Sequence, residues 1–349
     1  MNGTIALLFT WLLLWLVVIV GGCVLFTNAV EWLGRRLNLG QGAVGSVLAA
    51  VGTALPETLV GLVAILWVGK GAGHEIGVGA ILGAPLLLST LAMPITGIAV
   101  LAYSRRRPQG AAVVVDRRVL GRDLRWFYLL FAIVLMVSFA ARWPSGEQYW
   151  LLRNGAFPLR VLAALLIVPG YVYYVRLHIK EGEDEGHDLE PLYFARRALV
   201  PSPLLVVGQC CLALAVIILG ARCFAGQVQV TAAALQVSPQ ILALIIAPIA
   251  TELPEKMNSV LWVRQGKDTL ALGNISGAMV FQGSVPVMAG MLLTEWRLDH
   301  AAMAAMLCAF GATLVLTLNM RIFRRLPAAA LIACGGFYVV WLVATFFSG

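Results

Sequence analysis

Two glutamates, Glu57 and Glu255, each directly follow a proline inside matching short sequences, Thr-Ala-Leu-Pro-Glu and Thr-Glu-Leu-Pro-Glu. In a helix, each proline lacks an N–H to donate, and its ring displaces the carbonyl four residues back. The carbonyls of Gly52 and Ala250 are thereby freed, and free carbonyls are costly in hydrocarbon unless something satisfies them. Carbonyl and carboxylate oxygens are the hard ligands that suit calcium and also sodium. We therefore expect the two sequences to form the halves of one cation site.

Three more polar residues are candidates for this site: Glu252, Asn274 and Gln282. Glu252 can share a helix face with Glu255, and it precedes Lys256 by four residues, in the favourable order for an ion pair. Two roles stay open for it: a pair with Lys256, or a proton carrier, because low-dielectric surroundings favour a neutral carboxyl group. Asn274 and Gln282 fall on one helix stripe, as ligands or as hydrogen bonds between helices.

The elements that must position these residues are membrane-spanning helices. The chain is 60% hydrophobic and 12% charged, with a mean hydropathy of +0.89, whereas a soluble domain carries about 25% charged residues. Apolar runs of about 20 residues recur along it, the length a helix needs to cross a bilayer, without the alternating polarity typical of a membrane barrel. We expect an all-α, polytopic membrane protein with about ten spans at 4–27, 43–68, 76–103, 125–142, 157–178, 203–223, 236–263, 268–293, 299–320 and 327–347.

The charge distribution indicates an orientation. The formal net charge is +8, and the Lys and Arg residues concentrate in alternate loops, which places those loops inside and both termini outside. The membrane orientation explains the positive net charge, so no nucleic-acid partner is needed to account for it. The composition fits a bacterial inner membrane.

The spans divide into two halves of five, residues 1–180 and 199–349, joined by an acidic linker at 181–198. We expect the linker to be cytoplasmic and solvated, with a regulatory cation site as the alternative. The third span of each half carries a similar sequence, Gly-Ala-Ile-Leu-Gly-Ala at 79–84 and Gly-Asn-Ile-Ser-Gly-Ala at 273–278, whose glycine spacing favours close helix packing. Because five is odd, the halves are expected to be inverted repeats, and in such transporters the site lies near the bilayer midplane.

These paired motifs resemble those of the cation/calcium exchanger superfamily, which includes the sodium/calcium exchangers. Each inverted repeat of that family carries a Gly-Thr-Ser-x-Pro-Glu-like motif and then a Gly-Asn-x-x-Gly-Ser-Asn/Asp-like motif in the next helix. The resemblance implies antiport of calcium against sodium or protons by alternating access, with Glu57 and Glu255 as the paired calcium-binding carboxylates. It also implies that Thr53 and Thr251 supply backbone carbonyls, and that spans 1 and 6 move past a core of spans 2, 3, 7 and 8.

The sequence departs from the family pattern where side-chain oxygens would bind sodium. Ala54 and Glu252 replace the serine of the first motif, and Ala-Pro at 84–85 and Ala-Met at 278–279 replace the serine and amide or acid of the second. Alanine, proline and methionine offer no hard oxygen ligand. We therefore expect proton coupling at least as readily as sodium coupling.

The sequence thus predicts a secondary active cation antiporter, with calcium as the substrate. The alternative is a degenerate homologue that acts as a membrane scaffold or subunit. No pattern of a catalytic centre indicates an enzyme, and the scattered cysteines and histidines indicate no bound cofactor. Its expected partners are inorganic cations and the lipid bilayer, and nothing in the sequence indicates an oligomeric state.

Overall fold

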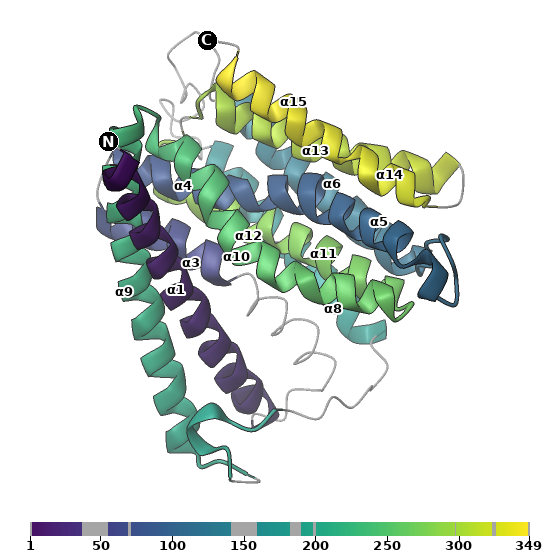
Figure 1. Ribbon diagram of the computed structural model, residues 1–349, viewed down its shortest axis with the longest axis horizontal. Helices are drawn as coiled ribbons and strands as arrows, with labels where there is room; N and C mark the ends of the chain where they lie inside the picture. The colour runs from purple at the N-terminus through teal and green to yellow at the C-terminus, as the bar shows by residue number, and fades with distance from the viewer. Residues whose placement is uncertain are drawn as a thin grey trace.

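The computed structural model describes residues 2–36, 55–68, 71–140, 159–181, 190–197, 200–296, 298–322 and 326–347. Within these ranges every regular element is a helix (Figure 1). The elements before the linker are α1 (Asn2–Arg36), α3 (Leu55–Val63), η2 (Ala64–Val68), α4 (Ala72–Leu87), η3 (Leu88–Ala92), α5 (Met93–Ala102), η4 (Ser104–Arg106), α6 (Arg117–Ala140) and α8 (Leu159–Glu181). Those after it are η5 (Tyr193–Ala195), α9 (Pro203–Leu235), α10 (Pro239–Arg264), α11 (Asp268–Gln282), α12 (Val285–Leu293), α13 (His300–Ile322), α14 (Ala328–Ala333) and α15 (Gly335–Phe346).

Ten apolar segments of the described chain fall on the ten expected spans. Eight are long and apolar enough to cross a membrane: Ile5–Leu33, Ala72–Ala102, Arg117–Ala140, Leu159–His178, Pro203–Leu235, Asp268–Leu293, His300–Ile322 and Ala328–Phe346. The two shorter ones, Thr58–Val68 and Pro239–Ile249, lie in the second and seventh expected spans. These are the spans with the Pro-Glu sequences, and residues 43–54 and the side chains at 253–258 lie outside the described set. The all-α, polytopic membrane fold is confirmed.

The fourth span begins earlier than expected. Helix α6 starts at Arg117 rather than near residue 125, because Asp116 caps it: the Asp116 carboxylate accepts the N–H of Arg118 at 2.7 Å, as an N-terminal capping aspartate does. The cluster of charges after Arg117 hid this start in the sequence. The longer helix brings Asp123 into the packed interior, where 1% of it is exposed.

Helices α1 and α9 form an antiparallel pair along one side of the bundle (Figure 1). Gly22 of α1 lies against Ile217, and Gly220 of α9 lies against Ile19, so increasing numbers on one helix meet decreasing numbers on the other. Gln209 ties the pair together by donating to the carbonyl of Leu25 at 2.8 Å. The first helices of the two halves therefore run in opposite directions, and the halves pack on each other rather than forming separate bodies.

Helices α4 and α10 cross in close contact at two glycines of α4. A Cβ atom at Gly79 would lie 2.3 Å from the carbonyl oxygen of Gln240, and one at Gly83 would lie 2.5 Å from that of Leu244. Close packing is thus confirmed for the glycines of the first half. For the second half, a Cβ at Gly273 or Gly277 would meet no atom closer than 3.7 Å among the described residues, so no close packing is seen there.

The third and eighth spans both contain a discontinuity. In the third, a π-helical turn, η3, joins α4 to α5, and Pro85 lies inside α4. In the eighth, α11 ends at Gln282 and α12 begins at Val285. Hydroxyl groups bond backbone carbonyls near both: Ser89 donates to the carbonyl of Pro85, and Ser284 to that of Val280. Such turns are frequent at functional sites.

Connections that we expect on one side of the membrane meet in the structure. Arg107, between α5 and α6, donates to Asp268 at the start of α11 at 2.6 Å, and both side chains are buried. Gln109 of the same connection donates to the carbonyl of Gly266 in the α10–α11 turn. These contacts agree with the expected alternation of spans, and they show that Arg107 is half of a buried ion pair as well as a loop charge.

Candidate functional site

Helix α10 carries the second Pro-Glu sequence and is continuous. It runs as one α-helix from Pro239 to Arg264, through Pro254. The prediction that Pro254 interrupts the helix of this span is therefore wrong. Pro254 still cannot donate to the carbonyl four residues back. The first Pro-Glu sequence is described from Leu55 onward, where Pro56 and Glu57 belong to α3, and the residues just before Leu55 lie outside the described ranges.

Glu252 is the buried carboxylate of the site. It is 0% exposed, and its Oε1 accepts a hydrogen bond from the Nε2 of Gln282 at 2.8 Å. Gln282 is itself 0% exposed and is the last residue of α11. The structure thus brings two of the predicted site residues together across the α10–α11 pair, beside the break that leads into α12.

Helix α11 presents its polar side chains on two faces. Gln282 faces α10, where the hydroxyl of Ser259 also donates to the carbonyl of Ala271 at 3.3 Å. Asn274 lies on the same stripe as Gln282 and is partly buried. Ser276 faces the other way and bonds Asp123 of α6. Two roles were suggested for Gln282, a cation ligand or a hydrogen bond between helices, and the structure shows a hydrogen bond between helices.

The remaining predicted ligands are only partly described. Thr53 lies outside the described residues, and so do the side chains of Glu57, Thr251 and Glu255. Their backbones place Glu57 in the first turn of α3 and the other two in α10. The Lys256 side chain is likewise outside the described set, so its pairing with Glu252 stays a prediction. Among the side chains that are described, no three His, Cys, Asp or Glu groups converge as a metal site would require.

The apolar replacements of the family's sodium-site residues are firmly packed. Ala84 and Met279 are 0% exposed and Ala278 is 2% exposed, and Pro85 is also buried. These side chains lie in the interior of the bundle, so the core contains no side-chain oxygen at these positions. No sodium site built from them is chemically reasonable.

The burial of two further carboxylates was not predicted from the sequence. Asp123 accepts bonds from Tyr174 at 3.0 Å and from Ser276, and Asp268 pairs with Arg107. Both were assigned to the margins of spans, where charges are ordinary. The capping pattern at Asp116, one residue before a long run of helix formers, is the signal that could have placed Asp123 inside a helix.

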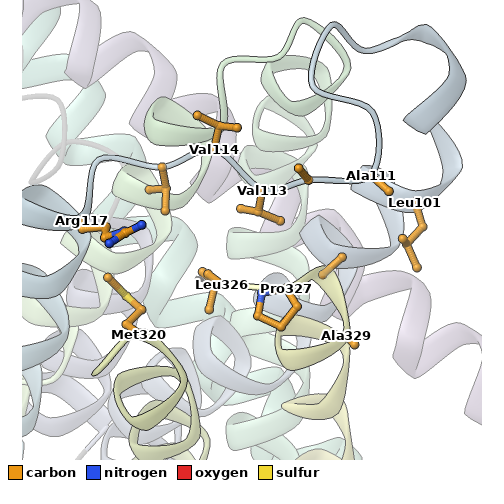
Figure 2. Close-up of a pocket in the computed structure, with 12 residues that line it drawn as sticks. Leu101, Ala111, Val113, Val114, Arg117, Met320, Leu326, Pro327 and Ala329 are labelled. Carbon is orange, nitrogen blue, oxygen red and sulfur yellow. The ribbon is translucent and has the colours of Figure 1, made fainter. Parts of the chain in front are cut away.

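The structure contains a cavity of about 630 Å³ between the α5–α6 connection and the start of α14. Figure 2 shows it between the chain at Val113 and Val114 and the turn at Leu326 and Pro327. Its lining is mostly apolar, with Arg117 at one side. No predicted cation-site residue lines it, so this cavity is separate from the site on α10 and α11.

Comparisons with known proteins agree with this architecture. The family model of the sodium/calcium exchanger protein matches residues 7–180 and 205–347. The CaxA protein of Alkalimonas amylolytica, a candidate antiporter, is 24% identical over 328 residues, covering 90% of this chain and 91% of its own. The inner membrane protein YrbG of Escherichia coli strain K12 is 26% identical over 320 residues, covering 90% of this chain and 89% of its own.

Two solved structures share the fold. The crystal structure of the H⁺/Ca²⁺ exchanger CAX superposes with a TM-score of 0.72 at 16% identity, covering 98% of this chain and 86% of that one. The sodium-calcium exchanger NCX_Mj, soaked with 2.5 mM Na⁺ and 10 mM Sr²⁺, gives a TM-score of 0.56 at 18% identity, covering 97% of this chain and 99% of that one.

Proposed function

We propose, from the premise that this chain belongs to the sodium/calcium exchanger protein family, that it is a secondary active antiporter exchanging calcium for protons or sodium. Family membership confirms the resemblance of its motifs. The observation that carries the proposal is Glu252, fully buried on α10 and bonded to Gln282 of α11. A carboxylate inside a membrane bundle is expensive, and such groups mark ion or proton pathways. The solved relatives are named as exchangers of calcium with protons or sodium.

We propose that residues 1–180 and 199–349 are inverted repeats. The helix directions support this division. Helices α1 and α9 are antiparallel. Helix α4 runs parallel to α10, from the register of Gly79 with Gln240 and of Gly83 with Leu244. Helix α11 runs antiparallel to α10, because Glu252 meets Gln282 and Ser259 meets Ala271. Helix α11 is therefore antiparallel to α4, its counterpart in the first half. Alternating access would then be motion of the α1–α9 pair past the core of α3, α4, α10 and α11.

The calcium site of this proposal is formed by Glu57 of α3 and Glu255 of α10, with the backbone carbonyls of Thr53 and Thr251. Two carboxylates neutralise a divalent cation, and carbonyl oxygens complete a flexible coordination shell. Asn274 and Gln282 lie within the same core and could add amide oxygens when an ion is bound.

Glu252 is proposed as the proton-carrying group. Burial penalises its charged form unless a proton or a cation neutralises it, and Gln282 can remain its partner in either state because an amide both donates and accepts. The apolar residues at 84–85 and 278–279 supply no sodium ligand, so proton coupling is favoured.

Ion flux into proteoliposomes tests this function. Calcium uptake would be measured under an imposed proton gradient and then under a sodium gradient. The variants Glu57→Gln and Glu255→Gln are expected to abolish uptake, while Glu75→Gln, an exposed carboxylate in the first turn of α4, should leave it unchanged. Uptake that survived both site variants would refute the assignment of the carboxylates. Absence of flux for every cation would favour the non-transporting scaffold or subunit instead.

A separate variant tests the proton carrier. Glu252→Gln keeps the hydrogen bond to Gln282 but cannot release a proton. We expect calcium-dependent stabilisation of the purified protein to persist while proton-driven uptake is lost. A proton-driven rate equal to that of the unchanged protein would reject Glu252 as the carrier.

We also propose a bacterial inner-membrane location with both termini outside. The concentration of Lys and Arg in alternate connections supports that orientation. Alkaline phosphatase fused to the C-terminus should be active in intact cells, because it folds only outside the cytoplasm; an inactive fusion with normal expression would reverse the orientation.

A further inference from the structure

A second buried polar cluster lies on the side of α11 that faces away from Glu252. Its centre is Asp123 of α6, which is 1% exposed. Oδ1 of Asp123 accepts from the hydroxyl of Tyr174 at 3.0 Å and lies 3.1 Å from Nε2 of His178, both on α8. Oδ2 accepts from the hydroxyl of Ser276 on α11 at 2.5 Å. One carboxyl group therefore joins three helices.

The geometry of His178 sets the number of protons in this cluster. Its Nε2 faces Asp123, and its Nδ1 lies 3.3 Å from the backbone oxygen of Tyr174. Both neighbours are acceptors, but a neutral imidazole has only one N–H. With a neutral histidine and an ionised aspartate, one ring nitrogen would direct a lone pair at an oxygen. One additional proton removes this conflict, either on the imidazole or on the carboxyl group, which can then donate to Nε2.

The side chain of His178 is 21% exposed while that of Asp123 is enclosed, and His178 is the last residue of the span Leu159–His178, so the histidine is the accessible member of the pair. Among the described residues, Tyr174 of this cluster interacts electrostatically with Asp123 and Arg122 of α6 and with Tyr171 of α8. Helix α11 contributes the hydroxyl of Ser276. The tyrosines are neutral at ordinary pH, and ionisable groups within a membrane bundle mark functional positions by default.

We propose that Asp123 and His178 together form a proton-binding site that fastens α8 to α6 and α11, and that its occupancy makes cation exchange sensitive to pH on its side of the membrane. Helix α11 also carries Gln282, the partner of Glu252. Loss of the proton leaves one ring nitrogen of His178 with a lone pair directed at an oxygen, which weakens the contact of α8 with α6 and α11. Helix α11, which bounds the cation site, is then held less firmly. The effect on exchange rests on the proposed function, whereas proton binding itself does not.

The first test measures thermal unfolding of the purified, calcium-free protein as a function of pH. The midpoint temperature of the unchanged protein should be a few degrees lower at about pH 8 than at about pH 5, because the proton that joins the pair is lost as the pH rises. His178→Gln retains an amide donor toward Asp123 but does not titrate, so its midpoint should lose that pH dependence. His300→Gln, at the exposed start of α13, is the matched control and should keep it.

A pH dependence of equal size in His178→Gln and in His300→Gln would overturn the proton site. Asp123→Asn should behave as His178→Gln does, and if that variant fails to fold, the histidine pair of variants still decides the outcome.

The second test measures calcium uptake against pH in proteoliposomes. At a fixed imposed pH difference across the membrane, the rate of His178→Gln should vary less with pH than the rate of the unchanged protein, and the variation that remains is that of the proposed proton carrier Glu252. A flattened unfolding profile with an unchanged transport profile would refute the link to α11. Failure of the unchanged protein to transport any cation would refute the proposed function, and the unfolding test would still decide the proton site.

Discussion

The close crossing of α4 and α10 predicts opposite effects for two equivalent glycine substitutions. In Gly83→Ala, the new Cβ would lie 2.4 Å from Cγ of Pro248 and 2.5 Å from the carbonyl oxygen of Leu244, whereas ordinary contact begins at 3.4 Å. The helices must separate by about 1 Å, because a backbone carbonyl cannot rotate away as a side chain can. In Gly277→Ala, the nearest atom is the hydroxyl oxygen of Tyr174 at 3.7 Å, so the methyl group fits without movement.

The magnitudes follow from packing and helix propensity. Overpacking costs about 1–3 kcal/mol, with the upper end expected for Gly83→Ala because the obstruction includes backbone. Each alanine also gains about 1 kcal/mol of helix propensity over glycine. Gly83→Ala should therefore lose about 2 kcal/mol and Gly277→Ala should gain about 1 kcal/mol. This difference of about 3 kcal/mol corresponds to about 4 °C in midpoint temperature, at about 2.1 cal/mol/K of unfolding entropy per residue.

Thermal unfolding of the two purified variants in the same detergent is the assay. Gly83→Ala should also reduce calcium uptake, because Pro248 lies one helical turn before Glu252 on α10. A Gly83→Ala midpoint equal to or above that of Gly277→Ala would refute the close crossing. Reduced uptake in Gly277→Ala at full stability would show instead that this glycine has a role in the ion path.

Three further substitutions test individual contacts. Arg107→Ala should destabilise the protein by about 3–5 kcal/mol because it leaves the buried Asp268 carboxylate without its cation, and adding Asp268→Asn should restore part of the loss; a lower midpoint in the double variant than in the single one would contradict this pairing. Gln282→Leu removes the amide donor to Glu252 and should cost about 1–3 kcal/mol, with reduced uptake; full stability and full uptake together would show that the bond is dispensable. Gln209→Leu removes the hydrogen bond between α9 and a carbonyl of α1 and should cost about 1–3 kcal/mol of stability. Calcium-dependent stabilisation should persist, because the cation site lies elsewhere. Loss of that stabilisation would indicate that the α1–α9 pair contributes to the site.

The span pattern is the part of the fold that hydropathy predicts well. Each helix must satisfy its own backbone hydrogen bonds in the bilayer, so about 20 apolar residues suffice to identify it. The prediction was less accurate where charge enters a span. The start of α6 was placed at 125 rather than at Arg117, because a run of arginines looks like a loop until a packed neighbour for Asp123 is known. Helix α10 was expected to break at Pro254 and does not.

The glycine motifs illustrate how similar sequences acquire different environments. Both halves place two glycines four residues apart, but within the described part of the chain it is Gly79 and Gly83 that face a neighbouring backbone. Gly273 and Gly277 face side chains of α6 and α8 at ordinary distances. Which face of a helix meets a partner depends on segments far away in the chain, and glycine spacing does not contain that information.

By itself, the sequence determined the membrane-embedded, all-helical class, the ten spans and the family, because hydropathy and the Pro-Glu motifs act over short stretches of chain. Only the tertiary structure decided that Glu252 bonds to Gln282 and that Asp123 joins α6, α8 and α11. These contacts join residues 30 and 153 positions apart. A buried polar group must find a partner wherever packing supplies one, so its partner is set by the arrangement of all the helices together.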